Sequence, residues 1–172
     1  RGLSVVHTTI NGLGEFSGLA ATEEFAAAID MHSKISLGLN YSKLQKASNL
    51  VSKITGIKTP PFKPITGKSA LAIPETEETQ EFIYNLNLEN KIDEGMPIPP
   101  HLIGKNVKFS IGKKCNEFTV LYNLKECGYE ISNREAKIIA KEVRRRLSTR
   151  NKYCLITQND LVNIYLKIKD RI

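Results

Sequence analysis

Near its N-terminus the chain reads Val5-Val6-His7-Thr8-Thr9-Ile10-Asn11-Gly12-Leu13-Gly14-Glu15. The run from Val5 to Ile10 is rich in β-branched residues and predicts a strand. Two glycines around one apolar residue then predict a turn with unusual backbone angles or close backbone approach. In α/β proteins, ligands bind on loops at the carboxyl ends of strands. The turn is therefore either a ligand-binding loop or only a structural one.

The residues around this turn carry two further expectations. Strand alternation places His7 and Asn11 on one face, where a lone histidine is expected to be a packed polar residue rather than a ligand. After the turn, Thr22 is predicted to cap a helix whose first turn holds Glu23 and Glu24, near the positive helix end.

Two helices joined by stiff segments are predicted for the middle of the chain. An amphipathic helix over 41–55 should end at Gly56, and its apolar stripe consists of Leu44, Ala47, Leu50, Val51 and Ile54. A proline-containing linker follows. A second helix is predicted from Thr76 to about Asn90, with Phe82, Ile83 and Leu86 facing inward, before another proline-rich linker.

The last third predicts a compact unit. Val107, Phe109 and Ile111 alternate as in a short strand, and a helix over 116–127 follows, which Gly128 should end. Ser132-Asn133-Arg134-Glu135 is a capping box, and it opens a helix with Ala136, Ile139, Val143 and Leu147 on one side. A final helix, capped by Thr157 to Asp160, carries Leu161, Ile164, Tyr165 and Ile168 inward.

The N-terminal motif resembles the last strand and loop of the catalytic barrel in the 2-isopropylmalate synthase and homocitrate synthase family. That family has Asn-Gly-x-Gly-Glu-Arg-x-Gly-Asn, then a helix with paired glutamates, whereas this chain has Phe16 for the arginine and Leu19 for the last asparagine. Further matches follow in order, in Thr55-Gly56-Ile57, in 65–72 and in Gly112-Lys113-Lys114. Within this family, the chain resembles the homocitrate synthases, including those of nitrogen fixation, some of which are split into two subunits. It also resembles the Re-type citrate synthases, which are a divergent relative.

The resemblance implies an acyl-CoA-dependent synthase that condenses acetyl-CoA with a 2-oxo acid, giving homocitrate, citrate or 2-isopropylmalate. It implies a divalent metal held by one Asp and two His of earlier barrel strands, so the metal ligands are not expected in this chain. The family also has a catalytic His where this chain has Ile73, and isoleucine cannot transfer a proton. A catalytically inactive regulatory or assembly subunit is therefore an alternative, and no catalytic residue is assigned.

Four residues carry over from the family as substrate-binding candidates: Asn11, Gly12, Gly14 and Glu15. Asn11 and Glu15 would either contact the substrate or support a group that does, at the barrel mouth. The other interpretation is that Asn11 caps a turn and Glu15 caps a helix.

Charge and composition set the broad class. Residues 101–172 hold 16 Lys and Arg against 7 Asp and Glu, whereas the first hundred hold 9 against 11. The basic part is either a solvated face or a surface that binds nucleic acid or the phosphates of a nucleotide. A nucleic-acid-binding module is the less favoured alternative, because no aromatic residues that could stack on bases are interleaved with the charges. Three cysteines without metal-ligand spacing, and no apolar run of membrane-spanning length, predict a cytoplasmic protein.

The expected fold class is α+β, mainly helical: the last strand and helix of a TIM-type barrel followed by two small linker subdomains. The expected division is 1–40 for the barrel end, 41–100 for a helical linker subdomain and 101–172 for a small α+β subdomain. A strand and helix cut from a barrel would expose apolar area. We therefore expect a homo-oligomer, and as a partner the N-terminal barrel portion or subunit. In such an assembly Leu44, Leu50, Val51 and Phe82 should be buried within or between chains.

Overall fold

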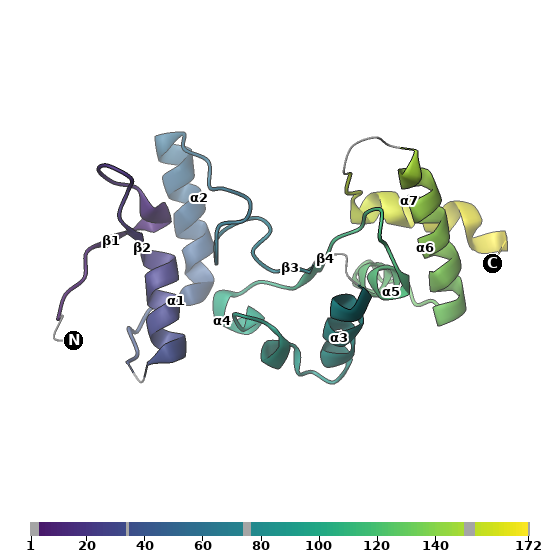
Figure 1. Cartoon of the computed structure of the whole chain (residues 1–172), viewed down its shortest axis with the longest axis horizontal. Helices are drawn as coiled ribbons and strands as arrows, with labels where there is room; N and C mark the ends of the chain where they lie inside the picture. Colours follow the sequence, from purple (N-terminus) through teal and green to yellow (C-terminus); the bar gives the residue numbers. More distant parts are fainter. Residues whose placement is uncertain (1–3, 34, 74–76, 150–153, 172) are drawn as a thin grey trace. The chain divides into compact units, whose positions relative to one another are not determined.

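The computed structural model describes residues 4–33, 35–73, 77–149 and 154–171 (Figure 1). The chain divides into two compact units, of which the first comprises Arg1–Leu71 with Ile98–Asn106 and the second Ala72–Pro97 with Val107–Ile172. Helices dominate the described residues, and the named strands form two short parallel pairs. This agrees with the predicted α+β, mainly helical class, while the barrel remnant and the three-part division remain predictions.

The first unit opens with a strand pair much shorter than the sequence predicts. Strand β1 (Thr8–Thr9) pairs in parallel with β2 (Ala20–Ala21), and the 3-10 turn η1 (Ile10–Gly12) follows β1 directly. Val5 and Val6 are exposed instead of paired. β-Branched residues favour an extended backbone, but a strand forms only where a neighbour supplies hydrogen-bond partners, and β2 supplies them for two residues.

Helix α1 (Thr22–His32) follows β2, and its cap differs from the prediction. The N-cap residue is Ala21, and Thr22 instead donates its hydroxyl to Thr8 Oγ1 at 2.9 Å. The buried face of α1 carries Ala26, Ala27 and, unexpectedly, the carboxylate of Glu23.

Helix α2 (Leu44–Thr55) follows the 3-10 turn η2 (Tyr41–Lys43) and ends at Gly56, as predicted. Its predicted apolar stripe is not buried within this chain, because Leu50 and Ile54 are 57% and 74% exposed, and its burial against another chain remains a prediction. The buried residues of α2 are Leu44 and Ser48. The helix packs on η1 through hydroxyl groups, and this polar contact turns the apolar side away from the unit. The short helix α4 (Pro100–Ile103) packs against η2.

The second unit is built on three helices. Helices α5 (Glu117–Glu126), α6 (Asn133–Ser148) and α7 (Gln158–Ile168) pack pairwise, and η4 (Lys169–Arg171) follows α7. The predicted stripe of α6 is confirmed, since its members are all buried: Ala136, Ile139, Val143 and Leu147. The capping boxes at Ser132 and Thr157 are also present, as the sequence predicts.

A smaller core lies beside these helices. Strand β3 (Ala72–Ile73) pairs in parallel with β4 (Lys108–Phe109), and helix α3 (Glu77–Leu88) leads to the 3-10 turn η3 (Ile92–Gly95). Ile83 on α3 is buried in this core, as predicted, but Phe82 is 57% exposed. Successive helical residues point about 100° apart, so the burial of Ile83 turns Phe82 away from the core. The predicted start at Thr76 lies outside the described residues.

Two further observations concern the chain as described. No disulfide joins the three cysteines. Within residues 4–33, 35–73, 77–149 and 154–171, the search for a helix long and apolar enough to cross a membrane finds none.

Candidate functional site

The side chain of Asn11 is fixed between the glycine-rich loop and helix α2. Its Nδ2 donates to the Ser48 carbonyl at 3.0 Å and to Ser52 Oγ at 3.2 Å, while Ser48 Oγ donates to Asn11 Oδ1 at 2.5 Å. Asn11 has a left-handed backbone with φ of 64°, which asparagine tolerates better than most residues. Every polar atom of the amide thus bonds a residue of α2, so the side chain holds the loop on that helix.

The backbone of Asn11 is bound by a carboxylate that the sequence analysis did not single out. Glu23 is fully buried, and both of its oxygens accept from the Asn11 N–H, at 3.1 and 3.2 Å. Thr66 Oγ1 donates to Glu23 Oε1 at 3.4 Å, and Lys63 Nζ lies 3.6 Å from the same oxygen. Lys63 also pairs with Glu24. The sequence shows only an acidic residue in a first helical turn, because the partners of Glu23 come from segments about 12 and 40 residues away.

The outer part of the loop is closed by its own backbone. Leu19 N donates to the Gly12 carbonyl at 3.1 Å, and Gly18 N donates to the Glu15 carbonyl at 2.8 Å. Gly12 is half-buried, whereas Gly14 and Glu15 are exposed. The structure therefore separates the four predicted site residues: Asn11 and Gly12 lie at the packed base of the loop, and Gly14 and Glu15 lie on its exposed rim. Their contact with a substrate remains a prediction.

We expect Gly18→Ala to destabilise the loop more than Gly38→Ala. Both glycines have positive φ, so alanine at either position costs roughly 1 kcal/mol in backbone strain. A Cβ at Gly18 would also lie 2.3 Å from the Gly12 carbonyl oxygen, whereas a Cβ at Gly38 would meet nothing within 4 Å. Urea unfolding of the two variants measures the difference, and equal losses would contradict the closure of the loop by its own backbone.

The structure also places two other positions of interest, and His7 differs from its expectation. His7 is exposed, so it is neither packed nor directed into a core. Ile73 is buried in the smaller core of the second unit, together with Ile83, Val107 and Phe109. An apolar core residue thus stands where the resembled family has a catalytic histidine.

The basic face of α6 carries less uncompensated charge than the sequence count indicates. Arg145 donates from Nε and a terminal nitrogen to the two oxygens of Glu142, at 2.7 and 2.8 Å, and Arg146 Nε adds a third bond at 2.7 Å. Lys137 Nζ lies 3.6 Å from Glu117 Oε1. Arg144 donates to the carbonyl of Cys115. Because of these partners, less unpaired positive charge remains on this face to bind phosphate groups.

The same arginines shift the titration of Glu142. Hydrogen bonds from Arg145, and then from Arg146, lower the pKa of Glu142 from 4.5 to about 2. Because the folded pKa is the lower one, this contribution to stability is complete above pH 4.5 and is lost as the pH falls toward 2. NMR titration of the carboxyl carbon should give the low midpoint, and Arg145→Gln should raise it; an unchanged midpoint in that variant would contradict the assigned cause.

Within the described ranges, no group of three or more His, Cys, Asp or Glu side chains is arranged to hold a metal ion. The described residues thus do not fit the metal site that the resembled family would require.

Comparison with known proteins gives a consistent set of relatives, although no family model matches the chain. The chain is 34% identical over 144 residues to a probable 2-isopropylmalate synthase of Ignicoccus hospitalis, an alignment that covers 84% of the chain. It is 30% identical over 160 residues, or 93% of the chain, to a putative (R)-citramalate synthase of Methanopyrus kandleri. It is 36% identical over 131 residues, or 76% of the chain, to a 2-isopropylmalate synthase of Methanocaldococcus jannaschii. The alignments cover 35%, 30% and 24% of these relatives, so the chain matches about a quarter to a third of each.

Proposed function

Because this chain belongs to the family of 2-isopropylmalate and (R)-citramalate synthases, we propose that it is one portion of an enzyme that condenses acetyl-CoA with a 2-oxo acid. The observation that carries the proposal is an identity of 30–36% extending over 76–93% of the chain. The aligned region is only about a quarter to a third of each relative, so in this proposal the chain acts with the remainder of a catalytic barrel. That remainder is either another part of the same protein or a separate subunit.

The first unit has the surface that such a barrel portion would cover. Beside β1 and α1 lies an apolar hollow of about 390 Å³, whose walls include Val6, Phe25, Ile29 and Leu37. Val5 and Phe16 are also largely exposed. Apolar side chains gathered in this way are typical of an interface rather than of a free surface. We propose that the earlier strands of the barrel pack here, and that residues 1–40 complete the barrel.

The glycine-rich loop would then lie at the mouth of that barrel. Asn11 is held by Ser48, Ser52 and Glu23, so its role is to fix the base of the loop. Glu15 is exposed on the rim, and a carboxylate there is free to accept a hydrogen bond from a bound substrate. In this proposal Glu15 contacts the substrate, with Gly12 and Gly14 shaping the loop.

The chemistry that needs a divalent metal is assigned to the remainder of the enzyme. A metal polarises the keto group of the 2-oxo acid in this type of condensation. From the loop, Glu15 contacts the substrate, and Asn11 holds the base of the loop in place.

A second candidate function is a regulatory or assembly subunit without catalysis, and the burial of Ile73 favours it. An isoleucine packed among Ile83, Val107 and Phe109 is part of a core, and it can neither donate nor accept a proton. Under this alternative the chain completes the fold of the enzyme and contributes no catalytic group from this position.

A chimera distinguishes the two candidates. The matching segment of the Methanocaldococcus jannaschii 2-isopropylmalate synthase is replaced by this chain, and thiol release from acetyl-CoA is measured with pyruvate, 2-oxoglutarate, oxaloacetate and 2-oxoisovalerate. Release with one of these acids supports the synthase proposal, and a folded chimera that binds acetyl-CoA without thiol release supports the assembly subunit. A Glu15→Gln chimera should raise KM for the oxo acid, with Glu130→Gln, exposed in the second unit, as the control. A chimera that fails to fold, while the parent enzyme folds, would contradict both.

A further inference from the structure

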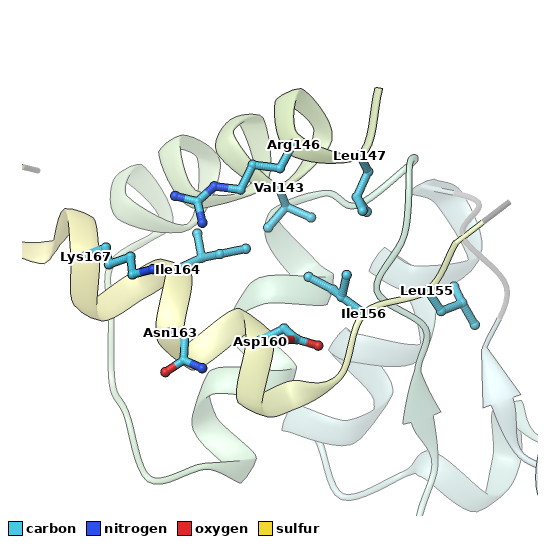
Figure 2. A pocket seen from close by; sticks show the side chains of 9 residues that line it. All are labelled: Val143, Arg146, Leu147, Leu155, Ile156, Asp160, Asn163, Ile164 and Lys167. Atoms are coloured by element: carbon cyan, nitrogen blue, oxygen red, sulfur yellow. The ribbon is translucent and has the colours of Figure 1, made fainter. Parts of the chain in front are cut away.

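The second unit contains a pocket that the proposed condensation does not use. It has a volume of about 420 Å³ and lies between α6, α7 and the segment that leads into α7 (Figure 2). This volume is within the range of small-molecule sites. Val143, Ile156 and Ile164 contribute aliphatic wall, and Figure 2 shows Arg146 on α6 and Lys167 on α7 extending into the space between the two helices.

The two cations are available to a ligand to different degrees. Arg146 donates from Nε to Glu142, but no described residue bonds its two terminal nitrogens. Lys167 forms no ion pair with any residue in the described part of the chain, and it is exposed. A guanidinium and an ammonium group from facing helices form a natural receptor for a carboxylate or a phosphate.

The remaining charges limit the ligand to a single negative charge. Asp160 also lines the pocket, and its Oδ2 accepts from the Thr157 N–H at 2.9 Å and from the Thr157 hydroxyl at 2.7 Å. Glu142, which accepts from Arg146 Nε at 2.7 Å, is a second acidic residue beside the cations, so two acidic side chains largely offset the two positive ones. A dianion or trianion would bring more negative charge than these two cations can balance, and the aliphatic walls would remove part of its hydration.

We propose that this pocket binds a small aliphatic monocarboxylate. Its carboxylate lies between Arg146 and Lys167, and its hydrocarbon chain lies toward Ile156. The proposal is independent of the condensation proposed above, because the pocket belongs wholly to the second unit and shares no residue with the glycine-rich loop.

The test uses the full chain labelled with ¹⁵N and titrated with hexanoate. Hexanoate at millimolar concentrations should shift the amide resonances of Ile156, Asn163 and Lys167 in a saturable way. Hexanol, which has the same chain but no charge, should bind at least about tenfold more weakly, because it lacks the charge-assisted hydrogen bonds. Arg146→Gln and Lys167→Gln should each weaken hexanoate binding about tenfold. Lys141→Gln, an exposed lysine of α6 that does not line the pocket, is the matched control and should have no effect.

Three results would overturn the proposal: no saturable shift with hexanoate, equal binding of hexanoate and hexanol, or unchanged binding in the Arg146→Gln, Lys167→Gln double variant. Phosphate binding at the same amides without hexanoate binding would also overturn it, and would assign the pocket to a more highly charged anion. Circular dichroism of each variant establishes that α6 and α7 are intact.

Discussion

Ile139→Ala is expected to lower the free energy of unfolding of the second unit by about 2–5 kcal/mol. Ile139 is completely buried at the centre of the core that α5, α6 and α7 form. Alanine removes three heavy atoms from a close-packed site, so the cost combines lost burial with a cavity that the neighbours fill only in part. Urea unfolding followed by circular dichroism measures the loss.

The adjacent residue supplies a control of identical chemistry. Ile138 lies on the same helix with 38% of its surface exposed. Ile138→Ala makes the same change in helix propensity, but it opens no closed cavity, so it should cost less than about 1 kcal/mol. Similar losses for the two variants would mean that α6 does not turn its Ile139 face to the core.

Glu23→Ala is expected to destabilise the first unit by about 2–5 kcal/mol. The substitution leaves the Asn11 N–H and the Thr66 hydroxyl without their buried acceptor, whereas Lys63 keeps its pair with Glu24. Each buried donor left without a partner costs about 1–3 kcal/mol. The amides of η1 and α1 should lose protection from hydrogen exchange, because Glu23 joins these two elements.

Glu24→Ala is the matched control for this prediction. Glu24 is the next residue in the same helical turn and also pairs with Lys63, but 38% of its side chain is exposed. Solvent screens such a pair, so its loss should cost no more than about 1 kcal/mol. If both variants lost the same stability, the buried contact between Glu23 and the loop would be absent in solution.

The second unit could be predicted closely from the sequence. The Ser132 and Thr157 capping boxes, the α6 stripe and the alternation of Val107, Phe109 and Ile111 all appear as expected. These features depend on residues three or four positions apart in a helix or two apart in a strand, so the local pattern contains the information. The family could be identified for a similar reason, since ordered short motifs are visible without a structure.

The first unit and the details of its loop could not be predicted in the same way. Glu23 looked like a residue of an acidic first turn and Thr22 like a helix cap, and the structure gives each a different role. The role of Glu23 depends on which distant segment packs against it. Asn11 is 37 residues from Ser48, and Glu23 is 43 residues from Thr66.

The sequence by itself therefore determined the capping boxes that open α6 and α7, which face of these helices is apolar, and which family the protein belongs to. Only the tertiary structure decided that Asn11 fixes the base of the loop on α2 while Glu15 stays exposed. It also decided that Glu23 is buried against the loop, and that Arg146 and Lys167 line the same pocket. Helix caps and periodic stripes are set by neighbours along the chain. Burial and hydrogen bonding of a polar group depend on long-range packing, because its partner is found only after the segments have come together.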